Sequence, residues 1–262
     1  MNTKNPSTRL SILAFLLILL LSACQPKATA TEEPITETSA SPSPQTTTSQ
    51  DSQAISKDLF LDPSLTQDQD SLAVSQYLYE GLVVLDENGN PQPGIAESWV
   101  ISDDQLDYIF TLRPGLVFSD GTAITPDIIA DNFNRWFDPK NALHKGGEYA
   151  SWEETFLGFL GEKDENDRAK STVDGIQKVD SNTVLLHLSR PVPETLSNLA
   201  QPAFAILNTT ALKPGEYGTQ GSEIISSGPF VVSSWNDSGL VLAPNTEYWG
   251  EAPAGNLNFT WR

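Results

Sequence analysis

A long stretch almost free of large apolar side chains divides this chain and limits which residues can fold. From Ala28 to Ser56, 16 of 29 residues are Ser, Thr or Pro, and Ile35 and Ile55 are the sizeable apolar side chains. Such a stretch cannot bury enough apolar surface to offset the conformational entropy that folding removes. We therefore predict a disordered tether over residues 24–56 and a folded part over residues 57–262.

The residues before the tether have the pattern of an export signal. Lys4 and Arg9 give a positively charged start, and Leu10 to Leu21 form a run of apolar residues broken by one serine. At ~1.5 Å per residue the run covers about 18 Å, which is short of the ~30 Å hydrocarbon core of a bilayer. The pattern predicts a signal peptide over residues 1–23 and no stable transmembrane anchor.

A single cysteine follows the apolar run. The sequence Leu21-Ser22-Ala23-Cys24 resembles the lipobox of bacterial lipoproteins, and Cys24 is the only cysteine of the chain. An intramolecular disulfide is therefore excluded. The resemblance implies cleavage before Cys24 and a lipid on its sulfur, such as palmitate-containing diacylglycerol. The chain would then be anchored by lipid to the outer or periplasmic face of a membrane. The alternative is an ordinary signal peptide followed by a chance cysteine.

The charge of the chain argues against anionic partners. The formal net charge is −19, and removal of Lys4 and Arg9 with the signal peptide would make it two units more negative. Like charges repel, so nucleic acid and anionic lipid headgroups are disfavoured as partners.

Periodicity predicts a mixed α/β fold with several antiparallel hairpins. Helical spacing indicates a helix from Asp70 toward Leu82, ended by Gly81, whereas strict alternation predicts a strand from Leu106 to Arg113. Thr125, followed by Pro126 and Asp127, predicts the start of a helix that continues to about Phe137. The further predictions are a hairpin over 173–188, a short helix ending at Leu199, and a hairpin over 229–243.

One turn has a spacing typical of a calcium loop. Asp86, Asn88, Asn90 and Glu97 occupy positions 1, 3, 5 and 12 of that count, but Pro91 stands where the loop needs glycine. The sequence therefore favours a plain hairpin turn and predicts no metal site.

The chain lacks recognisable catalytic motifs. His144 and His187 are not at metal-ligand spacing, and no nucleophile elbow, zinc-protease motif or phosphate-binding glycine loop is present. Acidic runs such as Glu162 to Arg168 are typical of solvated loops. The sequence therefore predicts no enzyme and no cofactor.

Four aromatic residues gather in a segment that we expect to be a loop. These are Tyr149, Trp152, Phe156 and Phe159. Such a group serves either as core or as a platform for a ligand, and we favour the core.

Several short segments, in order, resemble those of a known family. Together they are similar to the family 5 solute-binding proteins of bacterial peptide and nickel ABC importers, over residues 61–262. The segments are Tyr79–Leu82, Ile95–Trp99, Phe110–Gly115, Phe118–Thr122, Thr125–Asp127, Ser227–Phe230 and Asn245–Gly250.

The resemblance implies a lobe of type II periplasmic-binding-protein fold that captures a peptide or other small organic solute and delivers it to an ABC permease. Members are about twice this length, so we expect the second lobe to be absent. By alignment, the ligand contacts would include Thr66, Trp152 and Gln201. Because Gln201 replaces an arginine of nickel-binding relatives, an anionic metal chelate is disfavoured. The alternatives are a remnant that binds nothing and, least favoured, a secreted hydrolase.

Overall fold

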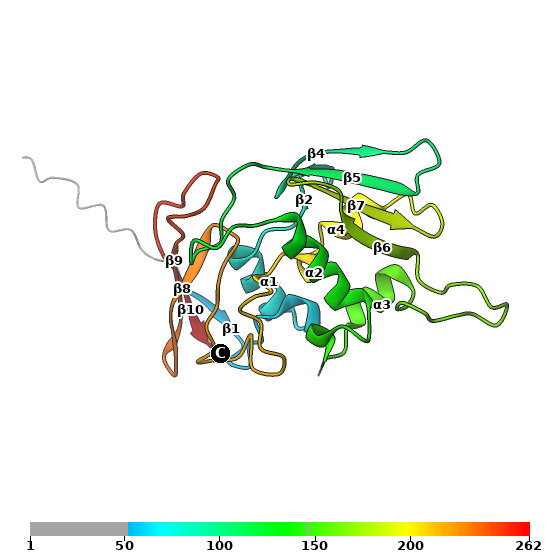
Figure 1. Ribbon diagram of the computed structural model, residues 1–262. Helices are drawn as coiled ribbons and strands as arrows, with labels where there is room; N and C mark the ends of the chain where they lie inside the picture. Colours follow the sequence, from blue (N-terminus) through cyan, green and yellow to red (C-terminus); the bar gives the residue numbers. More distant parts are fainter. Residues whose placement is uncertain (1–51, 146) are drawn as a thin grey trace, which may run out of the picture. The chain divides into compact units, whose positions relative to one another are not determined.

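The computed structural model describes residues 52–145 and 147–262, which form three sheets and four α-helices (Figure 1). The helices are α1 (Gln69–Leu78), α2 (Pro126–Phe137), α3 (Ala150–Phe156) and α4 (Thr195–Leu199). The strands are β1 (Ser52–Ile55), β2 (Val83–Leu85), β3 (Pro91–Pro93), β4 (Ala96–Ile101), β5 (Asp107–Leu112), β6 (Val173–Lys178), β7 (Thr183–Leu188), β8 (Phe230–Asn236), β9 (Gly239–Pro244) and β10 (Leu257–Trp261). The predicted signal peptide, Cys24 and nearly all of the predicted tether lie outside the described residues.

An antiparallel sheet of order β4-β5-β7-β6 packs against α2 (Figure 1). The predicted alternation of β5 is confirmed, since Tyr108, Phe110 and Leu112 are buried. The predicted start of α2 is also confirmed, because the Thr125 side chain accepts a hydrogen bond from the backbone N–H of Ile128, and Pro126 is the first helical residue. The predicted hairpin over 173–188 is formed by β6 and β7.

A second sheet, of order β1-β10-β9-β8, packs against α1 through a separate apolar cluster. The hairpin of β8 and β9 confirms the one predicted over 229–243. Strand β1 pairs in parallel with β10, with Ser52 opposite Asn258 and Ile55 opposite Trp261. Residues 52–55 therefore belong to the fold, and the predicted end of the tether at Ser56 is wrong. The polar sequence of β1 does not predict a strand. The strand forms because its backbone pairs with that of β10, far along the chain.

Two further predictions need correction. Helix α1 ends at Leu78, not at Gly81, because Tyr79 is already extended (φ −131°, ψ 146°) and leads into β2. The expected loop at Tyr149 contains helix α3. The helix ends at Leu157, which adopts the left-handed conformation (φ 68°). Glycine is the residue that usually marks such a helix end in a sequence.

The turn between β2 and β3 is the predicted hairpin turn. Asp86 Oδ1 accepts hydrogen bonds from the backbone N–H groups of Asn88 (2.9 Å) and Asn90 (2.8 Å). These bonds hold the carboxylate in the turn, and they lower the pKa of Asp86. Within residues 52–145 and 147–262, no three His, Cys, Asp or Glu side chains are grouped so that they could hold a metal ion.

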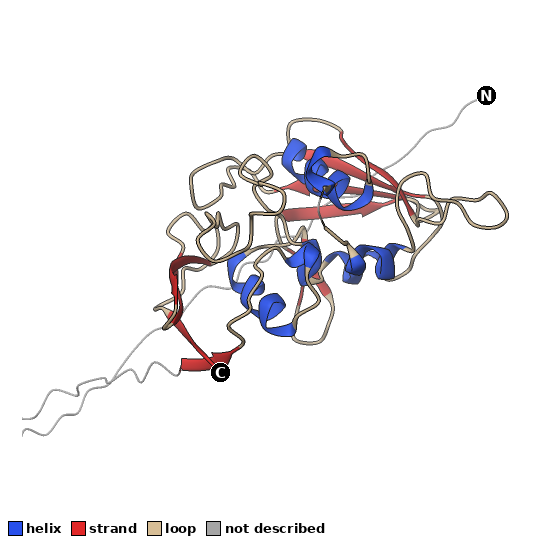
Figure 2. Ribbon diagram, turned by 90° about the horizontal axis from the view of Figure 1, so that it is seen from below, coloured by secondary structure: helices blue, strands red, loops and turns tan. Residues whose placement is uncertain are grey.

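The helices of the described residues are also too short or too polar to span a bilayer. Figure 2 shows the same elements from below, with the strands of the two larger sheets in red and the helices in blue.

Candidate functional site

The three elements that carry the candidate ligand contacts lie against one another. Thr66 follows a short 3₁₀ helix, η1 (Pro63–Leu65), and Gln201 precedes another, η3 (Pro202–Phe204). Helix η1 contacts both η3 and α3, which carries Trp152. A hydrogen bond of 3.1 Å from Gln67 Nε2 to Glu154 Oε1 also joins the segment after η1 to α3. The fold thus brings the three segments together. Of the three residues, Gln201 lines the pocket described below, whereas Thr66 and Trp152 do not.

The three side chains differ in their access to solvent. Thr66 and Gln201 are half-buried, whereas Trp152 is 1% exposed. The Trp152 indole N–H donates to the backbone oxygen of Gly158 at 3.1 Å, and its ring packs against Trp136 and Phe156. The core role favoured for the aromatic group is confirmed, with Tyr149 and Phe156 buried too. As a ligand contact Trp152 stays a prediction, and this structure gives it no exposed face.

Gln201 lies at a pocket of about 430 Å³ between the end of α1, strand β2 and the segment joining α4 to η3. The pocket is open to solvent and its wall is mainly apolar, with Val83, Val84 and Pro202 among its residues. The polar side chains of its wall are Ser75, Gln76, Tyr79, Glu80 and Gln201. A larger hollow of about 620 Å³ lies beside Asp164 and Arg168, an exposed ion pair of 2.8 Å in a surface loop. None of the three candidate residues lines that hollow.

Three of the segments that resemble family 5 meet beside the pocket. The backbone N–H of Glu80 donates to Ser227 Oγ at 3.0 Å, and Tyr248 Oη donates to Glu80 Oε2 at 3.1 Å. Burial raises the pKa of Glu80, and the hydrogen bond from Tyr248 and the charge of Arg113 oppose that shift. The carboxyl group therefore sits in a poorly hydrated place at the pocket wall.

A glycine allows this close packing. The backbone N–H of Gly228 donates to the Leu78 oxygen at 2.9 Å, and a Cβ on Gly228 would lie 2.9 Å from the backbone nitrogen of Tyr79. Real Cβ atoms essentially never come that close, so any other residue here would force the backbone at Gly228 or at Leu78 and Tyr79 to shift.

Arg113 and Trp249 pack together next to Glu80. The guanidinium carbon of Arg113 lies 4.3 Å from the centre of the Trp249 ring, and Arg113 Nε donates to the Gly94 oxygen at 2.7 Å. Such cation–π contacts stabilise by roughly 0.5–1 kcal/mol at partly exposed sites. Arg113 directly follows β5, and Trp249 lies in the segment between β9 and β10, so the contact joins segments attached to the two larger sheets.

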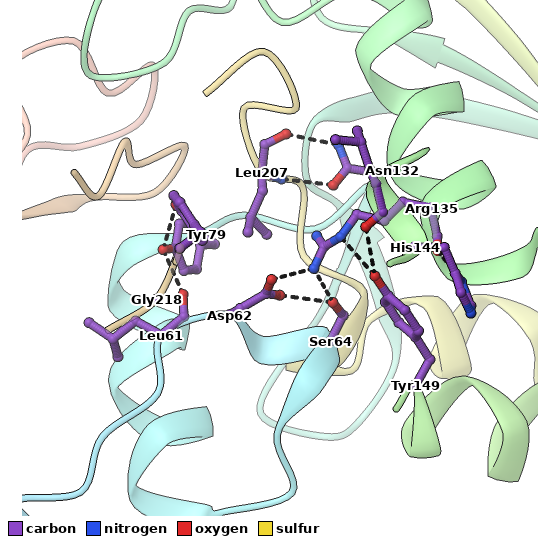
Figure 3. Close-up of polar contacts among 12 residues, drawn as sticks. Leu61, Asp62, Ser64, Tyr79, Asn132, Arg135, His144, Tyr149, Leu207 and Gly218 are labelled. Carbon is purple, nitrogen blue, oxygen red and sulfur yellow. Dashed lines mark hydrogen bonds and ion pairs between the residues drawn. The ribbon is translucent and has the colours of Figure 1, made fainter. Parts of the chain in front are cut away.

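A buried polar network joins α2 to η1 and to Tyr149 (Figure 3). Arg135 of α2 forms an ion pair with Asp62, and it donates hydrogen bonds to Ser64 Oγ (2.8 Å) and Tyr149 Oη (3.2 Å). Asp62 and Arg135 are 3% and 2% exposed. The sequence analysis missed this network, although an arginine between the buried Phe133 and Trp136 on one helix was a signal for it.

Comparisons with known proteins assign the chain to a family. A model of the bacterial extracellular solute-binding proteins, family 5 (middle region), matches residues 90–259. The chain belongs to this family. Family 5 proteins bind solutes and are not enzymes, and the expected type II fold is confirmed by the solved relatives.

Two curated relatives represent family 5. The periplasmic oligopeptide-binding protein OppA of Escherichia coli (strain K12) is 32% identical over 196 residues, 73% of this chain. The glutathione-binding protein GsiB of Shigella flexneri is 29% identical over 204 residues, 77% of this chain. The matched part is 35% of the length of each relative.

Two solved structures have the same fold. HbpA2 from Haemophilus parasuis superposes with a TM-score of 0.68 at 25% identity, covering 80% of this chain and 42% of that one. The substrate-binding domain of an oligopeptide ABC transporter from Bacillus anthracis superposes with a TM-score of 0.63 at 26% identity, covering 77% and 39%.

Proposed function

We propose that this chain captures peptides or similar small organic solutes outside the membrane and delivers them to an ABC permease. The observation that carries the proposal is the pocket at Gln201, which lies where signature segments of family 5 meet. Two relatives are named for binding oligopeptides and glutathione, which supports peptides and similar small molecules as the class of solute.

The wall of the pocket suits an organic solute. Apolar residues form most of it, and a few side chains can orient a ligand by hydrogen bonding. Because the pocket is open, the described residues supply one wall, and a tightly held solute needs a second wall opposite it. The wall contains no Lys or Arg, so it offers no charge partner to an anionic metal chelate.

Replacement of Gln201 by alanine is expected to weaken peptide binding about three- to tenfold. The change removes one polar contact, and a hydrogen bond of this kind contributes roughly 0.5–1.5 kcal/mol. Calorimetric titration with a mixture of short peptides measures the change. Gln177→Ala, at an exposed position of β6, is the matched control and should bind as the unaltered chain does. Equal affinity of the two variants would contradict the placement of the site.

We further propose that lipid on Cys24 holds the chain at the membrane. Cys24 lies outside the described residues, and the proposal is supported by the Leu21-Ser22-Ala23-Cys24 sequence after an apolar run. In cells of a lipoprotein-processing bacterium, Cys24→Ala should abolish the incorporation of labelled palmitate, because no other cysteine is present. Ser49→Ala, in the predicted tether, should leave labelling unchanged. Persistent labelling of Cys24→Ala would refute the anchor.

A further inference from the structure

Glu80 is the one charged residue in the wall of the Gln201 pocket. Its companions there are neutral: serine, glutamine, tyrosine and apolar residues. The rest of the chain is strongly acidic, but those other acids line other parts of the surface. A single carboxylate against an apolar wall is a specific feature, because a buried charge is costly unless it gains a partner.

The backbone of Glu80 is fixed on both sides. Its N–H donates to Ser227 Oγ at 3.0 Å, and its carbonyl oxygen accepts from the backbone N–H of Ile206 at 2.9 Å. Tyr248 Oη donates to Glu80 Oε2 at 3.1 Å. These contacts hold the carboxylate in one orientation before any solute arrives, which lowers the entropy lost on binding.

The other carboxylate oxygen is left without a partner. Within residues 52–145 and 147–262, no hydrogen bond to Glu80 Oε1 is formed. Arg113, whose positive charge acts on Glu80, is engaged with the Trp249 ring and the Gly94 oxygen, and no ion pair of the described residues joins it to Glu80. Burial raises the pKa of Glu80, and the hydrogen bond from Tyr248 and the charge of Arg113 offset only part of that shift.

We propose that Glu80 pairs with a cationic side chain of the bound solute, so that this pocket selects peptides carrying lysine or arginine. The inference rests on the proposed function, since it concerns the same pocket. The ammonium or guanidinium group supplies the donors that Oε1 lacks, and the methylene groups of the side chain lie along the apolar wall formed by Val83, Val84 and Pro202.

The test compares two probes that differ only in side-chain charge. They are trilysine and trilysine acetylated on its three side chains, titrated calorimetrically into the full chain in mild detergent at about 0.15 M salt, which screens the long-range attraction of an acidic protein. Glu80→Gln removes the charge but keeps an oxygen that can accept from Tyr248. Glu97→Gln is the matched control, at an exposed position of β4.

The unaltered chain and Glu97→Gln should bind trilysine roughly tenfold or more tightly than the acetylated probe. Glu80→Gln should bind the two probes with equal affinity, and its unfolding midpoint should equal that of the unaltered chain. A preference that survives in Glu80→Gln would overturn the inference. Equal binding of both probes by the unaltered chain would overturn it as well, while leaving the proposed capture of peptides intact. Binding of neither these probes nor a mixed peptide library would refute the proposed function itself.

Discussion

Replacing Arg135 by alanine should lower the free energy of unfolding by about 3–5 kcal/mol. The substitution leaves Asp62 as an unpaired charge that is only 3% exposed, and it removes the donors to Ser64 and Tyr149. An isolated buried carboxylate is far less stable than a hydrated one. Chemical denaturation followed by tryptophan fluorescence measures the change.

Two control variants test whether the loss of stability comes from leaving a buried charge unpaired, and not simply from removing a charged side chain. Lys178→Ala breaks the exposed pair between Lys178 and Asp127 (2.7 Å) and should cost no more than about 1 kcal/mol. The double variant Arg135→Met with Asp62→Leu removes both charges and should regain most of the lost stability. A loss below about 1 kcal/mol for Arg135→Ala would show that the pair is hydrated in solution and not buried as described.

The single substitution Trp152→Ala is expected to lower the free energy of unfolding by about 3–5 kcal/mol, because it leaves a large cavity in the aromatic core. The same denaturation experiment measures the change. The ring is 1% exposed and packs against Phe133, Trp136 and Phe156. Close packing leaves little room for the neighbours to fill the space.

Trp249→Ala is the matched control. Its ring is 37% exposed and contacts Arg113, so the loss should stay near 1 kcal/mol. A Trp152→Ala chain that unfolds at the normal denaturant concentration but loses peptide affinity would contradict the core assignment and support the role as a ligand contact.

The parts of the fold that were predicted correctly are those set by local physics. Helix α2 follows from Thr125 and Pro126, which cap and start it, and β5 follows from alternation between apolar and polar residues. The turn at Asp86 follows from Asn and Gly next to a short side-chain acceptor. In each case the deciding residues lie within a few positions of one another.

The parts that were missed depend on distant partners. Strand β1 exists because it pairs with β10, about 200 positions away, and nothing in its polar sequence indicates that. Helix α3 lacks a side-chain cap at Tyr149 and ends at Leu157 where glycine is usual, so its boundaries carry no sequence signal.

The site was predicted only in part. The resemblance to family 5 supplied Gln201, which lines the pocket, and Thr66 and Trp152, which do not, and Glu80 was noted only as part of a motif. Its place in the pocket wall depends on Ser227 and Tyr248, which approach it from far along the chain. Which side chains line a pocket is a property of packing, and periodicity does not encode it.

The most direct test of solute capture is the thermal unfolding of the full chain in mild detergent, with and without a mixed library of short peptides at millimolar concentration. A ligand that binds only the folded state, present at 100 times its dissociation constant, adds about 2.7 kcal/mol of stability. For a folded part of this size the unfolding midpoint should rise by about 5–10 °C. A cooperative transition whose midpoint does not change with peptide would contradict the proposed function.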